Sequence, residues 1–297
     1  MTSYKKAISC GMLLLAGSFM SIVPTTGFAE RVLYAINNQD PILHVVNPLT
    51  GAEISSVAIS VSGDSIANST GLAISPVSNE MYAAVALNSQ NRPERNIIKL
   101  DRETGLATNI GNSGQPIANL AFDDSGVLYA IIGDCKSGCG AGINPESLFT
   151  VDLNDGSLTF VQALGNGDDG EAIAFNPTDG MMYHMSGIGA GLIFEKINLS
   201  TGVVTPIPLS GDSVADLEAI GFTYDSAQGL FVGSLIDCNC GGSARQFISL
   251  TSEGLVTHVN PLVFWWKDYA FHDAADVPAA KKVPVAIFVI LGGDEDQ

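Results

Sequence analysis

The chain has 297 residues, and its 13 lysines and arginines are outnumbered by 31 aspartates and glutamates, which leaves a formal net charge of −18. Nucleic acids and anionic membranes are bound through lysine and arginine, so this balance argues against both as partners. The acidity suits a soluble exported protein and also one that binds divalent cations, and charge alone does not separate the two.

The first 29 residues have the layout of an export signal. Lys5 and Lys6 provide a positive start, residues 10–23 are apolar, and residues 27–29 form a small-x-small cleavage site. The apolar stretch is too short for a membrane-spanning helix. We therefore expect a mature chain that begins at Glu30, in the periplasm or outside the cell, with a net charge of −18 − 2 = −20.

Two short patterns recur five times along the rest of the chain. The first is an aliphatic–aromatic step after a turn, and its copies are Leu33-Tyr34, Met81-Tyr82, Leu128-Tyr129, Met182-Tyr183 and Leu230-Phe231. The second is a hairpin turn that ends in glycine, and its copies are residues 47–51, 101–105, 152–156, 198–202 and 251–254. The copies are about 48 residues apart, the length of one blade of a β-propeller. The sequence therefore predicts one all-β domain over residues 30–273, a β-propeller of five four-stranded blades.

The order of strands along the chain also predicts how the ring closes. First-strand segments, each ending in an apolar residue, are expected at 71–74, 118–122, 171–175 and 218–222. The chain itself starts at a second strand, residues 31–36, and supplies the missing first strand only at 267–271. We expect this late segment to pair with the N-terminal strands, because ring closure removes free sheet edges.

Residues 274–297 form an appendage whose structure the sequence leaves open. Residues 283–291 are apolar but far too few to span a bilayer, and no basic stop follows them. An extra outer strand, a floppy end and a truncated sorting tail are the alternatives. We expect no membrane span.

In a propeller, the connections from second to third strand and from blade to blade emerge on one face. Here they are the irregular ones, and binding residues usually lie on such connections. Four cysteines lie there: Cys135, Cys139, Cys238 and Cys240. In an exported chain they predict two disulfide bonds, closed locally or across loops. A zinc site and a redox-active pair are the alternatives.

Acidic residues gather at two blade junctions on the same face. Glu171 begins the predicted first strand of the fourth blade, with Asp169 two residues earlier, and Glu218 and Asp216 hold the equivalent positions in the fifth. Carboxylates that converge from neighbouring blades suit a hard cation, so we predict a calcium site. The alternative is that these acids cap turns or pair with Lys267 and stay in solvent.

The segment from Asp216 to Phe222 resembles a first-strand Asp-x-Glu-Gly motif of esterase-like and phytase-like propellers, with Ala219 in place of the glycine. That resemblance implies an acidic strand that faces the channel and holds calcium. More loosely, the whole mature chain resembles uncharacterised bacterial exported propellers with Leu-Tyr, Val-Asp and Thr-Gly repeats. This second resemblance implies the fold and export but no activity.

Aromatic residues and one histidine complete the candidates. Trp265, Trp266 and Lys267 form a predicted ligand-binding group, because paired indoles can stack on a sugar or a peptide. Burial at the seam of the first blade is the alternative for the tryptophans. Of the four histidines, His184 lies nearest the acidic residues and is the one candidate for a general base, with a hydrogen-bonded core histidine as the alternative.

Two functions are compatible with these features. The first is an exported, monomeric binding protein whose loop-bearing face engages an unknown protein, peptide or glycan. The second is a calcium-dependent hydrolase of lactonase or esterase type, in which the four acidic residues hold the cation and His184 moves protons. The sequence favours the first, because it contains no Gly-x-Ser-x-Gly, phosphate-loop or His-Glu-x-x-His motif.

Overall fold

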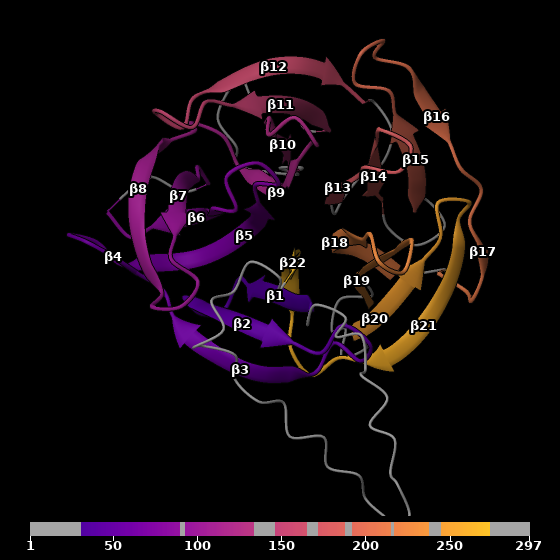
Figure 1. The fold of residues 1–297 in the computed structure, drawn as a ribbon, viewed down its shortest axis with the longest axis horizontal. Helices are drawn as coiled ribbons and strands as arrows, with labels where there is room; N and C mark the ends of the chain where they lie inside the picture. The colour runs from indigo at the N-terminus through magenta and orange to yellow at the C-terminus, as the bar shows by residue number, and fades with distance from the viewer. Residues whose placement is uncertain are drawn as a thin grey trace, which may run out of the picture.

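A computed structural model describes residues 31–89, 93–133, 146–164, 172–187, 192–214, 217–237 and 245–273. The regular structure in these ranges is entirely β, and its strands form five sheets arranged around a central axis (Figure 1). The predicted five-bladed β-propeller is therefore confirmed. No helix able to cross a membrane occurs in the part of the chain that the structure describes.

Each blade runs from an inner strand at the axis to an outer strand at the circumference. The first blade contains β22 (Trp266–Asp273), β1 (Arg31–Asn37), β2 (Ile42–Val46) and β3 (Glu53–Ala58). The second contains β5 (Ile66–Ile74), β6 (Met81–Leu87), β7 (Asn96–Leu100), β8 (Leu106–Asn112) and the short β4 (Ser60–Val61). The third contains β9 (Ile117–Phe122), β10 (Leu128–Ile132), β11 (Ser147–Val151) and β12 (Leu158–Ala163).

The last two blades follow the same order. The fourth contains β13 (Ala172–Asn176), β14 (Met181–Ser186), β15 (Ile193–Ile197) and β16 (Val204–Pro206). The fifth contains β18 (Leu217–Asp225), β19 (Leu230–Asp237), β20 (Arg245–Leu250), β21 (Leu255–Pro261) and the short β17 (Ser210–Gly211). The inner strands are thus β22, β5, β9, β13 and β18.

The repeated hairpin turns fold through their first and last residues. In the second blade, the Asp101 side chain accepts the backbone N–H of Glu103 at 2.9 Å, and Gly105 ends the turn with φ of +73°. Asp152 and Gly156 do the same in the third blade, with 2.8 Å to Asn154 N–H and φ of +76°. An aspartate or asparagine that binds its own turn, followed by a glycine in the left-handed region, forces the chain to reverse.

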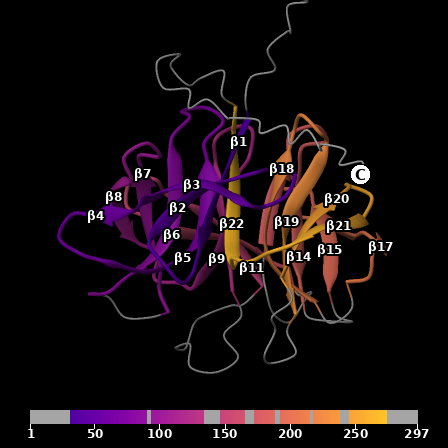
Figure 2. The same ribbon diagram turned by 90° about the horizontal axis from the view of Figure 1, so that it is seen from below.

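The late first strand closes the ring as the sequence predicts. β22 pairs antiparallel with β1 over its whole length, from Arg31 opposite Asp273 to Asn37 opposite Trp266. The two strands lie side by side in both ribbon views (Figures 1 and 2). The first blade is therefore built from both ends of the domain.

Two short strands that the sequence does not reveal cover outer edges. β4 pairs parallel with β8, and β17 pairs parallel with β21, each lying on the chain between one blade and the next. They give the outermost strands of the second and fifth blades a hydrogen-bonded neighbour. Open sheet edges invite aggregation, so this pairing protects the rim.

The core lies between blades, because each sheet packs both of its faces against its neighbours. Between the second and third blades, Tyr82 and Phe122 pack with ring centroids 5.6 Å apart. Between the fourth and fifth, Tyr183 and Phe231 approach to 4.6 Å. These contacts fix the blades around the axis and so fix the residues at its two ends.

Candidate ligand-binding faces of the ring

The ring has two different faces. β22 begins on the lower side of Figure 2 and ends on the upper side, where β1 starts. The upper side, which we call the short-turn face, carries the turns from first to second strand and from third to fourth strand. The lower side, which we call the loop face, carries the connections from second to third strand and from blade to blade.

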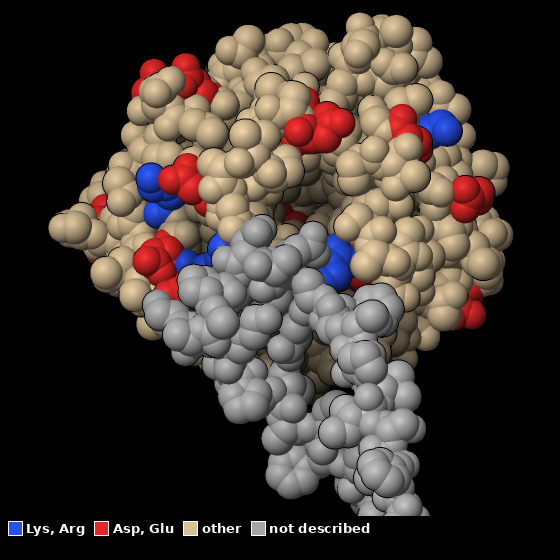
Figure 3. Space-filling model, viewed as in Figure 1, with Lys and Arg blue, Asp and Glu red and all other residues tan. Residues whose placement is uncertain are grey.

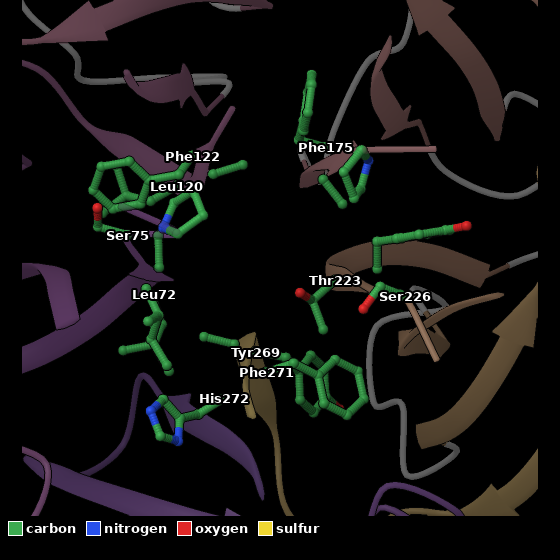
Figure 4. A pocket seen from close by; sticks show the side chains of 18 of the residues that line it. Leu72, Ser75, Leu120, Phe122, Phe175, Thr223, Ser226, Tyr269, Phe271 and His272 are labelled. Carbon is green, nitrogen blue, oxygen red and sulfur yellow. The ribbon is translucent and has the colours of Figure 1, made fainter. Parts of the chain in front are cut away.

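A cavity of about 320 Å³ opens at the axis on the short-turn face. Its wall contains an apolar residue near the end of every inner strand: Ile74, Phe122, Phe175, Phe222 and Phe271. Figure 3 shows this face hollowed at its centre, and Figure 4 shows the labelled side chains arranged around an open middle. We call this cavity the pit. Its volume falls in the range of small-molecule sites, about 300–1,000 Å³.

The rim of the pit is held in place by its own hydrogen bonds. Asp123 caps the turn of the third blade, accepting the N–H groups of Ser125 at 3.0 Å and Val127 at 2.9 Å. Asn176 caps the turn of the fourth through Thr178 N–H at 2.9 Å. Side chains that bind their own turn fix its conformation, so the pit is formed before any ligand arrives.

Arg31 joins the two ends of the ring across the rim. Its Nη1 donates to the Asp225 carboxylate, its Nη2 donates to Ser226 Oγ at 3.3 Å, and its guanidinium carbon lies 4.5 Å from the centroid of the Phe271 ring. One arginine thus connects the first blade to the turn of the fifth. Its charge is balanced by Asp225, so the pit combines apolar wall residues with a polar, paired rim.

Below the pit, inner strands are linked to one another through side chains. Asp268 of β22 is fully buried, and its carboxylate accepts the N–H of Leu72 in β5 at 2.6 Å and that of Tyr269 at 2.8 Å. Asn119 of β9 accepts Ile173 N–H of β13 at 3.1 Å. The inner strand of a propeller has an unpaired backbone edge, and these side chains satisfy it across the blade boundaries.

Burial raises the pKa of Asp268 well above its ordinary value, although the N–H groups of Leu72 and Tyr269 favour the charged form and act in the opposite direction. Sequence reasoning missed this residue. The available signal was its position three residues before the terminal Phe271, where the other inner strands carry Gly71, Asn119, Ala172 and Ala219. A polar residue among small ones at an inner-strand position marks a link between blades.

Most of the predicted acidic and cysteine site lies outside the described residues. Asp169, Glu171, Asp216 and the four cysteines Cys135, Cys139, Cys238 and Cys240 all fall there. Glu218 is described: it is half-buried in β18, opposite Ile236 of β19. The ranges that the structure describes contain no group of three histidine, cysteine, aspartate or glutamate side chains able to hold a metal ion. The calcium site and the disulfides stay predictions.

His184 belongs to a buried polar network between the third and fourth blades. The side chain has no exposed surface; its Nδ1 lies 3.0 Å from Glu195 Oε1 and its Nε2 lies 3.9 Å from Glu146 Oε2. Glu146 also accepts the hydroxyl of Ser186 at 3.1 Å. In this arrangement His184 contacts two carboxylates and no solvent.

The two predicted tryptophans have different environments. Trp266 is fully buried and donates its Nε1–H to Gly51 O at 3.0 Å. Trp265 is half-buried on the loop face, with the guanidinium carbon of Arg245 5.3 Å and the Nζ of Lys267 5.6 Å from its ring centroid. Only Trp265 and Lys267 of the predicted group can therefore meet a ligand, and Arg245 joins them.

Comparison with known proteins supports the fold. No family model and no curated protein matches the chain. Among solved structures, a chain in the crystal structure of a nidogen/laminin complex superposes with a TM-score of 0.53 at 10% identity, over 82% of this chain and 99% of that one. A protein of unknown function from Bacteroides caccae gives a TM-score of 0.49 at 10% identity, over 81% of this chain and 98% of that one. At such low identity the first likeness shows the propeller fold alone.

Proposed function

We propose that this protein is an exported, monomeric binding protein, a β-propeller that holds recognition residues rigidly at the two ends of its axis. The observation that carries the proposal is the pit, a preformed cavity of about 320 Å³ whose wall takes residues from all five inner strands. Apolar side chains combined with fixed polar groups are the usual chemistry of a ligand site, and the pit contains both. The ring supports them because its inner strands are tied together beneath the pit.

The loop face is the second part of the proposal. Binding residues on propellers and other rigid scaffolds usually lie on the long connections. Here the connection from β21 to β22 exposes two apolar side chains, Val263 and Phe264. The nidogen/laminin structure shows that a chain of this fold can occur in a protein complex, and we extend that class of role, partner binding, to this chain.

The described residues give no specific support to the alternative function, a calcium-dependent hydrolase. Three of its four acidic residues, Asp169, Glu171 and Asp216, lie outside the described ranges, and its general base His184 has no exposed surface. It stays a prediction, and chelation of calcium tests it directly.

The pit can be tested with the fluorescent dye anilinonaphthalene sulfonate, which brightens in apolar cavities. Thr223 lines the pit, so Thr223→Phe fills part of it, whereas Val203→Phe places the same ring on an exposed turn away from the pit. We expect the folded mature protein to bind the dye saturably, with weaker binding in T223F and unchanged binding in V203F. Equal dye binding by both variants and the parent protein contradicts the proposal.

A further inference from the structure

The connection between β21 and β22 presents apolar side chains on the loop face. Val263 is 82% exposed and Phe264 is 39% exposed, while Trp265 is half-buried beside them. Arg245, at the start of β20, and Lys267, in β22, lie next to the indole of Trp265. We call these five residues the Trp265 patch.

Arg245 has an unusual set of contacts for an arginine in so acidic a protein. It donates from Nη1 to Val263 O at 2.9 Å and lies over the Trp265 ring. Within the described ranges the structure gives it no carboxylate partner. A guanidinium has five N–H donors, and the bond to Val263 O uses one of them, so Arg245 is equipped to bind an anion as well.

The patch is supported from beneath by buried residues. Phe264 stacks on Trp266 with ring centroids 4.9 Å apart and an interplanar angle of 29°. Trp266 is fixed by its hydrogen bond to Gly51 O, and Leu262 N–H donates to Arg245 O at 2.7 Å. A surface whose side chains are already ordered loses little conformational entropy when a partner binds.

We propose that the Trp265 patch is the docking surface for a protein partner that presents a carboxylate beside an apolar or aromatic side chain. The inference rests on the loop-face part of the proposed function and names its partner chemistry. The carboxylate binds the guanidinium of Arg245, and the apolar side chain covers Val263 and Phe264. Aromatic residues and arginine are the residues most enriched in the energetic centres of protein interfaces.

The same contacts favour a protein partner over a glycan. Sugars stack on an open aromatic face, and here two cations lie within 5.6 Å of the Trp265 ring centroid while Phe264 gives one face to Trp266. The exposed branched aliphatic side chain of Val263 suits a side chain of similar character. The acidic remainder of the protein repels an acidic partner only weakly, because charges beyond about 8 Å are screened at physiological salt.

Intrinsic fluorescence reports on this surface directly, because the two tryptophans of the chain are Trp265 and Trp266. The mature full-length protein is titrated with a random copolymer of glutamate and tyrosine, with excitation beyond tyrosine absorption. We expect a saturable change of emission, weakened about tenfold by Arg245→Gln and by Val263→Ser. The matched control Leu106→Ser removes another exposed aliphatic side chain, from the second blade, and leaves the affinity unchanged.

Each other outcome overturns the inference. If R245Q and L106S bind the copolymer with equal affinity, Arg245 does not contribute to binding. If polyglutamate binds as tightly as the copolymer, the apolar contact does not contribute. Tighter binding of alginate assigns the patch to an acidic glycan. Concentration-dependent dimerisation that V263S abolishes assigns it to a second copy of the chain. If the copolymer does not bind while T223F still weakens dye binding, this inference fails and the pit remains a ligand site.

Discussion

Asp268 provides a quantitative test of how the inner strands are held together. Its carboxylate is fully buried and accepts the backbone N–H groups of Leu72 at 2.6 Å and of Tyr269 at 2.8 Å, and Asn119 and Leu120 also favour its charged form. Asp268→Asn keeps the shape but replaces one oxygen by NH₂, which faces an N–H donor. One buried N–H then lacks a partner, which costs about 1–3 kcal/mol. In a domain of this size each kcal/mol lowers Tm by about 2–4 °C.

The loss of stability is expected to depend on pH in one direction. Burial raises the pKa of Asp268 well above its ordinary value, against the opposing hydrogen bonds. Stability from a group whose folded-state pKa is raised is fully present below the unfolded-state pKa and is lost as pH rises through the folded-state pKa. Asparagine does not titrate. The advantage of wild type over D268N is therefore greatest in acid and shrinks toward alkaline pH.

Urea denaturation at acidic, neutral and alkaline pH measures both effects. The matched control is Asp124→Asn, which removes an exposed carboxylate and is expected to change stability by less than about 0.5 kcal/mol. Subtracting its small effect removes the general consequence of one fewer acid. The reasoning is refuted if D268N is as stable as wild type at every pH, or if its deficit grows as the pH is raised.

Two further predictions concern turn geometry and calcium. Gly105 has φ of +73° and an added Cβ there overlaps the Ala58 carbonyl oxygen, whereas Gly114 has φ of +68° and open space around it. In thermal or urea unfolding we expect Gly114→Ala to lower the stability by about 1 kcal/mol and Gly105→Ala to lower it by more than about 2 kcal/mol. Equal losses of stability in the two variants contradict the close contact at Gly105. If the predicted calcium site exists, EDTA lowers Tm and added calcium restores it. Calcium at a hundredfold excess over Kd contributes about 2.7 kcal/mol of stability, and the Glu171→Ala/Glu218→Ala variant loses this response. A Tm that EDTA leaves unchanged rules the site out.

Much of the fold could be predicted because its signals are local and repeated. The aliphatic–aromatic steps and the glycine-ended turns recur in every blade, so each copy supports the others. The same counting located the missing inner strand at 267–271, which the structure shows as β22 (Trp266–Asp273). The short strands β4 and β17 escaped prediction, because two residues show no periodicity and their partners belong to an edge defined only in three dimensions.

The candidate sites were less accessible to sequence reasoning, because they depend on which neighbours the fold brings together. Trp265 and Trp266 look equivalent in the sequence, yet successive residues entering a strand point to opposite sides. One indole therefore reaches Gly51 in the core and the other meets Arg245, twenty residues earlier in the chain. The pit was missed for a similar reason, since its wall joins five residues from five blades.

The strand that closes the ring, β22, connects the loop face to the short-turn face. β22 starts on the loop face beside the Trp265 patch and ends on the short-turn face at the pit, and between the two it carries Asp268, which binds the inner strand of the next blade. One strand of eight residues thus contributes to both proposed recognition surfaces and to the link between them. A substitution in β22 that loosens its pairing with β1 is therefore expected to weaken both surfaces together. Variants of Val263 or Thr223 act on one surface each, and comparing the two kinds of variant separates loss of a contact from loss of the ring.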